Sequence, residues 1–389
     1  MSDDEIPDLE PIRPELGNQT EPGNIPDAVD TLVRPPTALY SEPVPVLLLT
    51  GYLGSGKTTL VNHILTAKHR YRCAVLLNEI GDTADIEKAL VREPEGQEAA
   101  PLTDWVELEN GCICCSVKNE MVKSLESLLQ QRTKFDYIII ETTGLANPGP
   151  VASALWTDPE LETNLCLDAI VTVVDAVNIS RHLSTANEEH GEANEAQRQL
   201  AFADIILLNK LDLIDGEACS RVRSAIREIN ADAKIIQCIK CDIDLGEILH
   251  TGIYSGDKFL SAVESNGEEH VCSDICSHGA NHAHKHDVRT YTFFSDVPLD
   301  INKFRMWLDE FLWEEDEESA KKHEVYRIKG LLHAQGSNHK SILQAVHELY
   351  DIFEGKKWDQ DEVRHSKLVF IGKNLQDSVI ADAIEECKC

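Results

Sequence analysis

The residues best suited to chemistry begin with the run Gly51-Tyr-Leu-Gly-Ser-Gly-Lys57-Thr58, which fits the Walker A pattern G-x4-G-K-[ST]. The glycines would let backbone N–H groups point at phosphate oxygens, and a following helix start would add partial positive charge. Lys57 would reach the β- and γ-phosphates, and the Thr58 hydroxyl would face Mg²⁺. A glycine-rich turn without a ligand is the alternative. The candidate nucleotide-binding residues here are Gly51, Gly54, Ser55, Gly56, Lys57, Thr58 and Thr59.

A second feature is an apolar strand that ends in an acid, Asp136-Tyr-Ile-Ile-Ile-Glu141-Thr-Thr-Gly144. A carboxylate at the end of a strand beside a P-loop can hold Mg²⁺, directly or through water, or orient the attacking water. Gly144 would let a backbone N–H approach the γ-phosphate. An ordinary strand end is the alternative. We predict Lys57 and Glu141 as catalytic residues.

A third feature selects the base. Asn209-Lys210-Leu-Asp212 follows a strand-like segment and looks like the N-K-x-D motif of GTPases. The carboxylate of Asp212 can accept two hydrogen bonds from guanine, whereas adenine lacks that pair of donors and would leave the acid unpaired. The stem of Lys210 can lie along the base. This predicts GTP as the nucleotide, with an ATP-dependent kinase as a distant alternative.

Three thiols lie close together in Glu109-Asn-Gly-Cys112-Ile-Cys114-Cys115-Ser-Val-Lys118. This cluster suits a soft or borderline cation, and Zn²⁺ bound by three thiolates keeps one position for a fourth ligand. A helix beginning next to the thiols would lower their pKa and favour the thiolate form. Buried free cysteines and a redox dithiol are the alternatives. We predict zinc ligation by Cys112, Cys114 and Cys115.

The elements that must position these residues alternate between strand-like and helical patterns, which predicts a doubly wound, mostly parallel α/β sheet of the P-loop type. The strand-like segments are 44–50, Cys73–Asn78, Trp105–Leu108, Asp136–Ile140, Ala169–Val174, Asp204–Leu208 and Lys234–Gln237. A smaller C-terminal α+β domain is predicted from strands Arg289–Phe294, Val325–Lys329, 343–346 and Leu368–Ile371 and helices Ile301–Trp313 and Ser378–Glu386. The predicted divisions are a disordered acidic tail at 1–43, a GTPase domain at 44–264, a His/Cys-rich linker at 265–287 and the C-terminal domain at 288–389.

Composition limits the function classes. The chain of 389 residues carries a formal net charge of −32, which disfavours nucleic acid and anionic membrane surfaces as partners. No apolar run approaches the ~20 residues that cross a bilayer, and the acidic start does not resemble a signal peptide, so we expect a cytosolic or nuclear protein. Isolated Cys73 and Cys166 are expected in the core. The linker thiols and histidines from Cys272 to His286 are interpreted as a loose metal-gathering segment, or else as an incidental polar linker.

Together these motifs resemble the metallochaperone GTPases, the P-loop family that includes the nickel-inserting GTPases of hydrogenase and urease, and within it the CobW-type branch. The resemblance spans residues 44 to about 375, including Asn78-Glu79-Ile-Gly-Asp82, which is similar to the family's switch segment. It implies slow GTP hydrolysis with Mg²⁺ and a nucleotide-dependent hold on zinc at the C-x-C-C loop. It further implies that Glu79 and Asp82 lie near Mg²⁺ or the metal, with Asp82 a third catalytic candidate. It implies that the nucleotide is bordered by Ser116, Val117 and Lys118.

The resemblance also implies a client. In eukaryotic members of this branch, an N-terminal motif similar to C-P-x-L-V-P docks on the zinc-finger domain of type 1 methionine aminopeptidase. Ile6-Pro-Asp-Leu-Glu-Pro-Ile12 is similar, although Ile6 stands where Cys is common and Glu10 where Val is common. A chance match in the tail is the alternative. A zinc-buffering module with incidental GTPase activity and a regulatory GTPase without a metal role remain open as rival functions, and the oligomeric state is left open.

Overall fold

The computed structural model describes residues 43–67, 71–77, 106–107, 121, 125–126, 128–129, 135–157, 164–184, 194–254, 288–313, 323–360 and 362–389. Residues 42–389 form one compact unit. The predicted tail, the C-x-C-C loop, the switch segment and the His/Cys-rich linker lie outside the described residues. No helix among those described is both long and apolar enough to cross a membrane.

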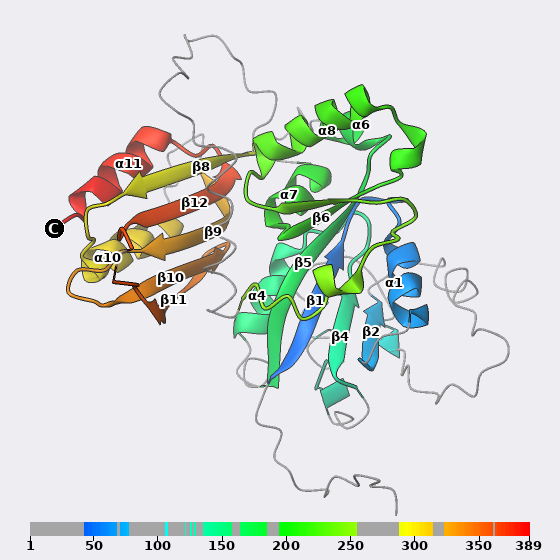
Figure 1. The fold of residues 1–389 in the computed structure, drawn as a ribbon, viewed down its shortest axis with the longest axis horizontal. Helices are drawn as coiled ribbons and strands as arrows, with labels where there is room; N and C mark the ends of the chain where they lie inside the picture. Colours follow the sequence, from blue (N-terminus) through cyan, green and yellow to red (C-terminus); the bar gives the residue numbers. More distant parts are fainter. Residues whose placement is uncertain are drawn as a thin grey trace, which may run out of the picture. The chain divides into compact units, whose positions relative to one another are not determined.

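The first part is a seven-stranded sheet in the order β3-β2-β4-β1-β5-β6-β7, and every pairing between its described strands is parallel (Figure 1). The strands are β1 Val44–Thr50, β2 Cys73–Leu77, β3 Val106–Glu107, β4 Tyr137–Glu141, β5 Leu165–Asp175, β6 Ile205–Asn209 and β7 Lys234–Gln237. This order, with β1 in the middle and later strands added on both sides, confirms the predicted doubly wound parallel sheet.

Both faces of this sheet are buried, because side chains alternate along each strand. On β1, Val46 and Leu48 pack into one apolar cluster and Leu47 and Leu49 into the other. Helix α1 (Lys57–Thr66) covers the second face, and the first face is covered by α4 (Gly149–Thr157), α6 (Ile179–Ser184), α7 (Glu195–Phe202) and α8 (Gly216–Ile229). Two short 3-10 turns, η2 (Leu211–Leu213) and η3 (Leu245–Glu247), follow β6 and β7.

The second part is a five-stranded antiparallel sheet in the order β11-β10-β9-β12-β8, packed against two helices. Its elements are β8 Val288–Ser295, α10 Ile301–Trp313, β9 Glu324–Leu332, β10 His339–Val346, β11 Leu349–Lys357, β12 Ser366–Lys373 and α11 Asp377–Glu386. The predicted α+β fold of this region is confirmed. Strand β11 was not predicted, because this edge strand is half-exposed and interrupts its apolar residues with charged ones.

Two further expectations need correction. Strand β5 begins at Leu165 rather than Ala169, because the buried carboxylate of Asp168 is satisfied by the Tyr137 hydroxyl at 2.6 Å and by backbone N–H groups of the segment after η3. A strand prediction that follows continuous apolar residues ends the strand at such an acid. Cys73 is buried as expected, but Cys166 is exposed, since it alternates with the inward-facing Leu165 and Leu167 on the same strand.

The two sheets meet through charged side chains that are buried. Arg327 and Lys329 of β9 both pair with Asp204, which directly precedes β6, and Lys329 also reaches Asp232 at 2.9 Å. The guanidinium of Arg327 donates to the Tyr254 hydroxyl at 2.9 Å. All of these acids and bases are buried or half-buried, so the contact depends on mutual neutralisation.

Candidate functional site

The glycine-rich loop between β1 and α1 is closed by a backbone hydrogen bond from Ser55 to the Tyr52 carbonyl at 3.1 Å. Two of its glycines cannot be replaced without displacing a neighbour. Gly51 has φ 143° and an added Cβ would lie 2.3 Å from the Val173 carbonyl oxygen; Gly56 has φ 116° and its Cβ would lie 2.6 Å from the Asn209 side-chain amide. The loop is therefore held against β5 on one side and against the N-K-x-D segment on the other.

The side chains of the loop fit an anionic ligand. Lys57 is buried and its ammonium donates to the Gly51 carbonyl at 2.9 Å, so the side chain folds back over the loop. The hydroxyl oxygens of Ser55 and Thr143 are buried and have no hydrogen-bond partner among the described residues. Thr58 is half-buried and Thr59 is exposed. A phosphate group would supply acceptors both for buried hydroxyls without a partner and for the lysine ammonium.

The acid-ended strand lies beside this loop. Glu141 is the last residue of β4, is 7% exposed, and pairs in register with Leu49 of β1. The next backbone N–H, that of Thr142, donates to the Leu49 carbonyl at 2.9 Å. An added Cβ on Gly144 would lie 2.7 Å from the backbone nitrogen of Leu53 in the P-loop. The Glu-Thr-Thr-Gly segment and the P-loop are thus in direct contact, as a magnesium or water-positioning role for Glu141 requires.

Asn209 and Lys210 of the N-K-x-D segment hydrogen-bond to the P-loop, whereas Asp212 is exposed. The Asn209 side chain donates to the Ser55 carbonyl at 3.0 Å. The Lys210 ammonium donates to the Gly54 carbonyl at 2.7 Å. Asp212, in η2, is exposed and has no hydrogen bond or ion pair within the described part of the chain. Its carboxylate is therefore open to a guanine base.

One functional acid escaped sequence reasoning. Asp175, the last residue of β5, accepts from the Lys210 ammonium at 2.8 Å and from Asn178 at 2.8 Å. Burial alone would raise the pKa of Asp175, but these hydrogen bonds outweigh it and lower the pKa below its usual range. The carboxylate of Asp175 therefore stays ionised and holds the ammonium of Lys210 in the N-K-x-D segment. Its signal was available, since it too is an acid at the end of an apolar strand.

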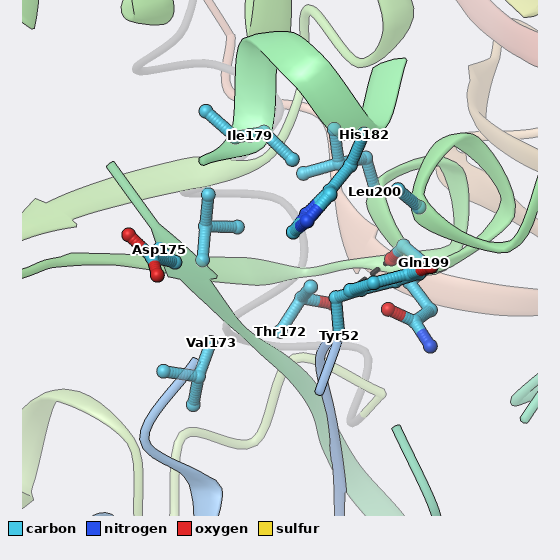
Figure 2. Close-up of a pocket in the computed structure, with 10 residues that line it drawn as sticks. Tyr52, Thr172, Val173, Asp175, Ile179, His182, Gln199 and Leu200 are labelled. Atoms are coloured by element: carbon cyan, nitrogen blue, oxygen red, sulfur yellow. Dashed lines mark hydrogen bonds between the residues drawn. The ribbon is translucent and has the colours of Figure 1, made fainter. Parts of the chain in front are cut away.

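A second overlooked residue holds the loop that follows Glu141. The side-chain amide of Gln199, on α7, donates to the carbonyls of Gly144 and Ala146, both at 3.1 Å. Figure 2 shows Gln199 lining a small pocket together with Tyr52 of the P-loop and His182 of α6. The rings of Tyr52 and His182 lie 4.1 Å apart. Helix α7 therefore holds the Glu-Thr-Thr-Gly segment directly and lines a pocket together with Tyr52 of the P-loop.

The remaining predicted site residues lie outside the described ones: Glu79, Asp82, Cys112, Cys114, Cys115, Ser116, Val117 and Lys118. The strands that lead into these segments are described. Leu77, the end of β2, pairs in register with both Glu107, the end of β3, and Glu141. Within the described ranges, no group of three His, Cys, Asp or Glu side chains could hold a metal ion.

A change at Asp212 tests the base assignment. The variant Asp212→Asn places an amide opposite the guanine donors, so we expect GTP affinity to fall about 10- to 100-fold, the cost of one charge-assisted pair of hydrogen bonds. Xanthine carries a carbonyl where guanine carries its amine, so affinity for the xanthosine nucleotide should rise. Competition among GTP, ATP and the xanthosine triphosphate measures both effects. Equal losses for all three nucleotides would contradict base recognition by Asp212.

Comparison with known proteins agrees with this geometry. The model of the CobW/HypB/UreG nucleotide-binding domain matches residues 45–237, and that of the cobalamin synthesis protein cobW C-terminal domain matches residues 288–388. The zinc-regulated GTPase metalloprotein activator 1 of Schizosaccharomyces pombe is 36% identical over 357 residues, covering 86% of this chain and 83% of that protein. The zinc chaperone YjiA of Escherichia coli is 34% identical over 346 residues, covering 88% and 98%.

A solved structure extends the likeness to three dimensions. The crystal structure of Zn(II)-bound YjiA GTPase from E. coli superposes with a TM-score of 0.63 and 26% identity, covering 90% of this chain and all of that one. These relatives match along both sheets, so the likeness is not limited to a shared P-loop. With its P-loop, its N-K-x-D segment and its second, antiparallel sheet, the chain belongs to the CobW-type branch of the metallochaperone P-loop GTPases, together with the zinc chaperones and the zinc-regulated GTPase metalloprotein activators.

Proposed function

We propose that this protein is a zinc chaperone that couples the binding and hydrolysis of GTP to the transfer of zinc to a client metalloprotein. The family supplies GTP, Mg²⁺ and Zn²⁺ as its ligands. The observation that carries the coupling is the row of strand ends Glu107, Leu77 and Glu141. Two strand spacings, ~10 Å, separate the outer two, so the chain leading to Cys112 leaves the sheet close to the candidate catalytic acid.

The described side chains support a hydrolysis step. Lys57 would exchange the Gly51 carbonyl for the β- and γ-phosphate oxygens, while Glu141 orients the attacking water. Mg²⁺, when bound beside Thr58, would neutralise phosphate charge. Gln199 would hold the loop of Gly144 so that its N–H faces the γ-phosphate. Loss of that phosphate would then remove the contact between this loop and the nucleotide.

The metal half of the proposal assigns zinc to Cys112, Cys114 and Cys115. With GTP bound, the switch segment at Glu79 and Asp82 and the thiol loop would be ordered together. Hydrolysis would release that order and let zinc pass to the client. We place this reaction in the cytoplasm, where free thiols stay reduced.

The variant Cys114→Ser tests the carrier role. We expect unchanged GTP affinity and at least a tenfold loss of transferable zinc, because a hydroxyl is a poor substitute for a thiolate on zinc. Bound zinc and client activation are measured with GTP, GDP and a non-hydrolysable analogue. Cys219→Ser, a half-buried cysteine of α8, is the matched control and should behave as the native protein. Normal client activation by Cys114→Ser, or zinc binding that ignores the nucleotide, would refute the proposal.

For the client, we propose type 1 methionine aminopeptidase, docked through residues 6–12. The similarity of Ile6-Pro-Asp-Leu-Glu-Pro-Ile12 to the docking motif supports this, and extended proline-flanked peptides suit groove binding. In the same assay, the double substitution Pro7→Ala with Leu9→Ala should abolish transfer to this enzyme while leaving GTP turnover intact. Unimpaired transfer would remove this client and keep the chaperone role.

A further inference from the structure

A pair of cysteines lies next to the candidate nucleotide site, in the turn Cys238-Ile-Lys-Cys241 that follows β7. Both thiols are buried, and both residues contact the side-chain oxygen of Asn209, Cys238 through its sulfur and Cys241 through its backbone N–H. The two residues between them, Ile239 and Lys240, are exposed. The buried thiols therefore flank an exposed dipeptide, and a local opening of this turn would bring them within reach of a small solute.

Each thiol is also bonded to a nucleotide-binding motif. The Cys241 thiol donates to the carbonyl of Gly56, the P-loop residue before Lys57, at 3.4 Å. The Cys238 thiol contacts the side-chain oxygen of Asn209 at 3.7 Å, and that oxygen also accepts the Cys241 N–H at 3.1 Å. Asn209 in turn donates to Ser55. The two cysteines thus connect the P-loop with the N-K-x-D segment.

The backbone of the turn is held in an unfavourable conformation. Lys240 and Cys241 have φ of 53° and 56°, in the left-handed region that residues with a Cβ seldom occupy. Such residues persist only where their surroundings fix them. Here the fixing contacts are those of Cys241 with Gly56 and Asn209, so a change at the sulfur is transmitted to the nucleotide site.

We propose that Cys238 and Cys241 are a reversible thiol–disulfide site that lowers the affinity for guanine nucleotides when it is oxidised by a hydroperoxide. The inference rests on the nucleotide site described above. The thiolate of Cys238 attacks the peroxide oxygen, forming a sulfenic acid and releasing an alcohol or water. The Cys241 sulfur then attacks the Cys238 sulfur, an S–S bond forms, and the hydroxyl leaves as water. Two thiols thus give up two electrons and two hydrogens per hydroperoxide.

The order of attack follows from the different environments of the two thiols. Interaction with the neighbouring Cys241 lowers the pKa of Cys238, while interaction with Cys238 and burial raise the pKa of Cys241. Cys238 is therefore the thiol that ionises first and acts as the nucleophile, and Cys241 resolves the intermediate.

Disulfide formation removes both S–H donors and draws the sulfurs to ~2.05 Å. The Gly56 carbonyl and the Asn209 side chain each lose a contact, and the Cys241 sulfur moves away from the P-loop. Because two weak hydrogen bonds to the P-loop and the N-K-x-D segment are lost, we expect the dissociation constants of GTP and GDP to rise about tenfold.

The experiment measures GTP affinity of the full-length protein in the reduced state, after hydrogen peroxide, and after subsequent dithiothreitol. Trypsin cleaves after Lys240, so a disulfide would join peptides 235–240 and 241–258, which mass spectrometry can detect. We expect the joined peptide, the tenfold loss of affinity, and the recovery of both with dithiothreitol. Cys241→Ser, compared with itself before and after peroxide, should show no change, and Cys219→Ser should respond as the native protein does.

The outcomes separate the two proposals. Failure of the reduced protein to bind GTP would refute the nucleotide site itself. If the reduced protein binds GTP normally, three results would refute the thiol site alone. The first is that no joined peptide forms, and the second is that it forms while the GTP affinity stays unchanged. The third is that Cys241→Ser loses GTP affinity after peroxide as much as the native protein does. Loss of affinity that dithiothreitol does not reverse would also refute it, because it would indicate oxidation beyond the disulfide.

Discussion

A protein carrying Lys57→Ala is expected to hydrolyse GTP about 10²- to 10³-fold more slowly, the typical cost of removing one preorganised charged donor from a reacting centre. Lys57 is buried, and its ammonium donates to a neutral carbonyl oxygen, that of Gly51. A phosphate oxygen offers a charged acceptor in its place, and such hydrogen bonds are about twice as strong. Single-turnover hydrolysis and equilibrium binding of GTP measure the two parts of this effect.

The same variant separates the proposed chaperone from a passive zinc buffer. If zinc transfer depends on the nucleotide, Lys57→Ala should lose transfer along with hydrolysis, although its thiols are untouched. A buffer would deliver zinc normally. Lys234→Ala is the matched control, because Lys234 is exposed on β7 and pairs with Glu247 at the surface. It should leave hydrolysis and transfer within about twofold of the native values.

The sequence predicts a candidate nucleotide site because the chemistry of such a site depends on short, contiguous spacings. The P-loop needs glycines at fixed offsets before Lys57, and the base motif places Asp212 a fixed distance after Asn209. Strand β1 was predicted with its observed bounds, since a strand buried on both faces is a continuous apolar run. In such cases the local pattern and the tertiary requirement coincide.

Sequence reasoning failed where a polar side chain finds its partner far along the chain. Asp168 looked like the end of an apolar segment, yet its partners are Tyr137 and the residues after His250. Gln199 gave no signal because its role is set by the Gly144 loop, more than fifty positions away. Burial of such groups becomes favourable only once the fold supplies the matching donors and acceptors.

The buried charges between the two sheets are a further example. Arg327 and Lys329 alternate with apolar residues along β9 in a pattern that suggests a solvent-exposed face. The structure buries that face instead, against Asp204 and Asp232. The sequence could not show this, because the neutralising acids belong to the other sheet.

The second large effect is expected at this contact. In Arg327→Met, the carboxylate of Asp204 stays buried and loses the guanidinium, keeping Lys329 and the Ile170 N–H, so we expect the free energy of unfolding to fall by about 3 kcal/mol. The guanidinium of Arg327 also donates to the Phe202 carbonyl at 2.6 Å, at the C-terminal end of α7. Protection of α7 amides from hydrogen exchange should therefore drop as well. Denaturant unfolding and hydrogen exchange measure the two effects.

The pH dependence of this loss identifies its cause. Burial alone would raise the pKa of Asp204, but Arg327 and Lys329 outweigh burial and lower the pKa below its usual range. Because the folded-state pKa is the lower one, the stabilisation is complete above the unfolded pKa and is lost as the pH falls through the folded value. Without Arg327 that pKa must rise, so native and variant stabilities should converge towards acidic pH. Arg221→Ala, which breaks an exposed pair with Glu217, should cost less than about 0.5 kcal/mol.

A double variant then shows whether an unpaired buried charge or lost packing causes the destabilisation of Arg327→Met. Arg327→Met combined with Asp204→Leu removes the buried acid together with its partner, so most of the lost stability should return if the uncompensated carboxylate is the cause. If the double variant is less stable than Arg327→Met, the contact depends instead on the shape of the pair and its hydrogen bonds to Phe202 and Tyr254. GTP turnover measured on both variants shows whether α7, which holds the Gly144 loop through Gln199, transmits the change to the nucleotide site. A loss of turnover in Arg327→Met that the double variant does not repair would indicate that the guanidinium at the end of α7, rather than the charge balance, keeps that loop in place.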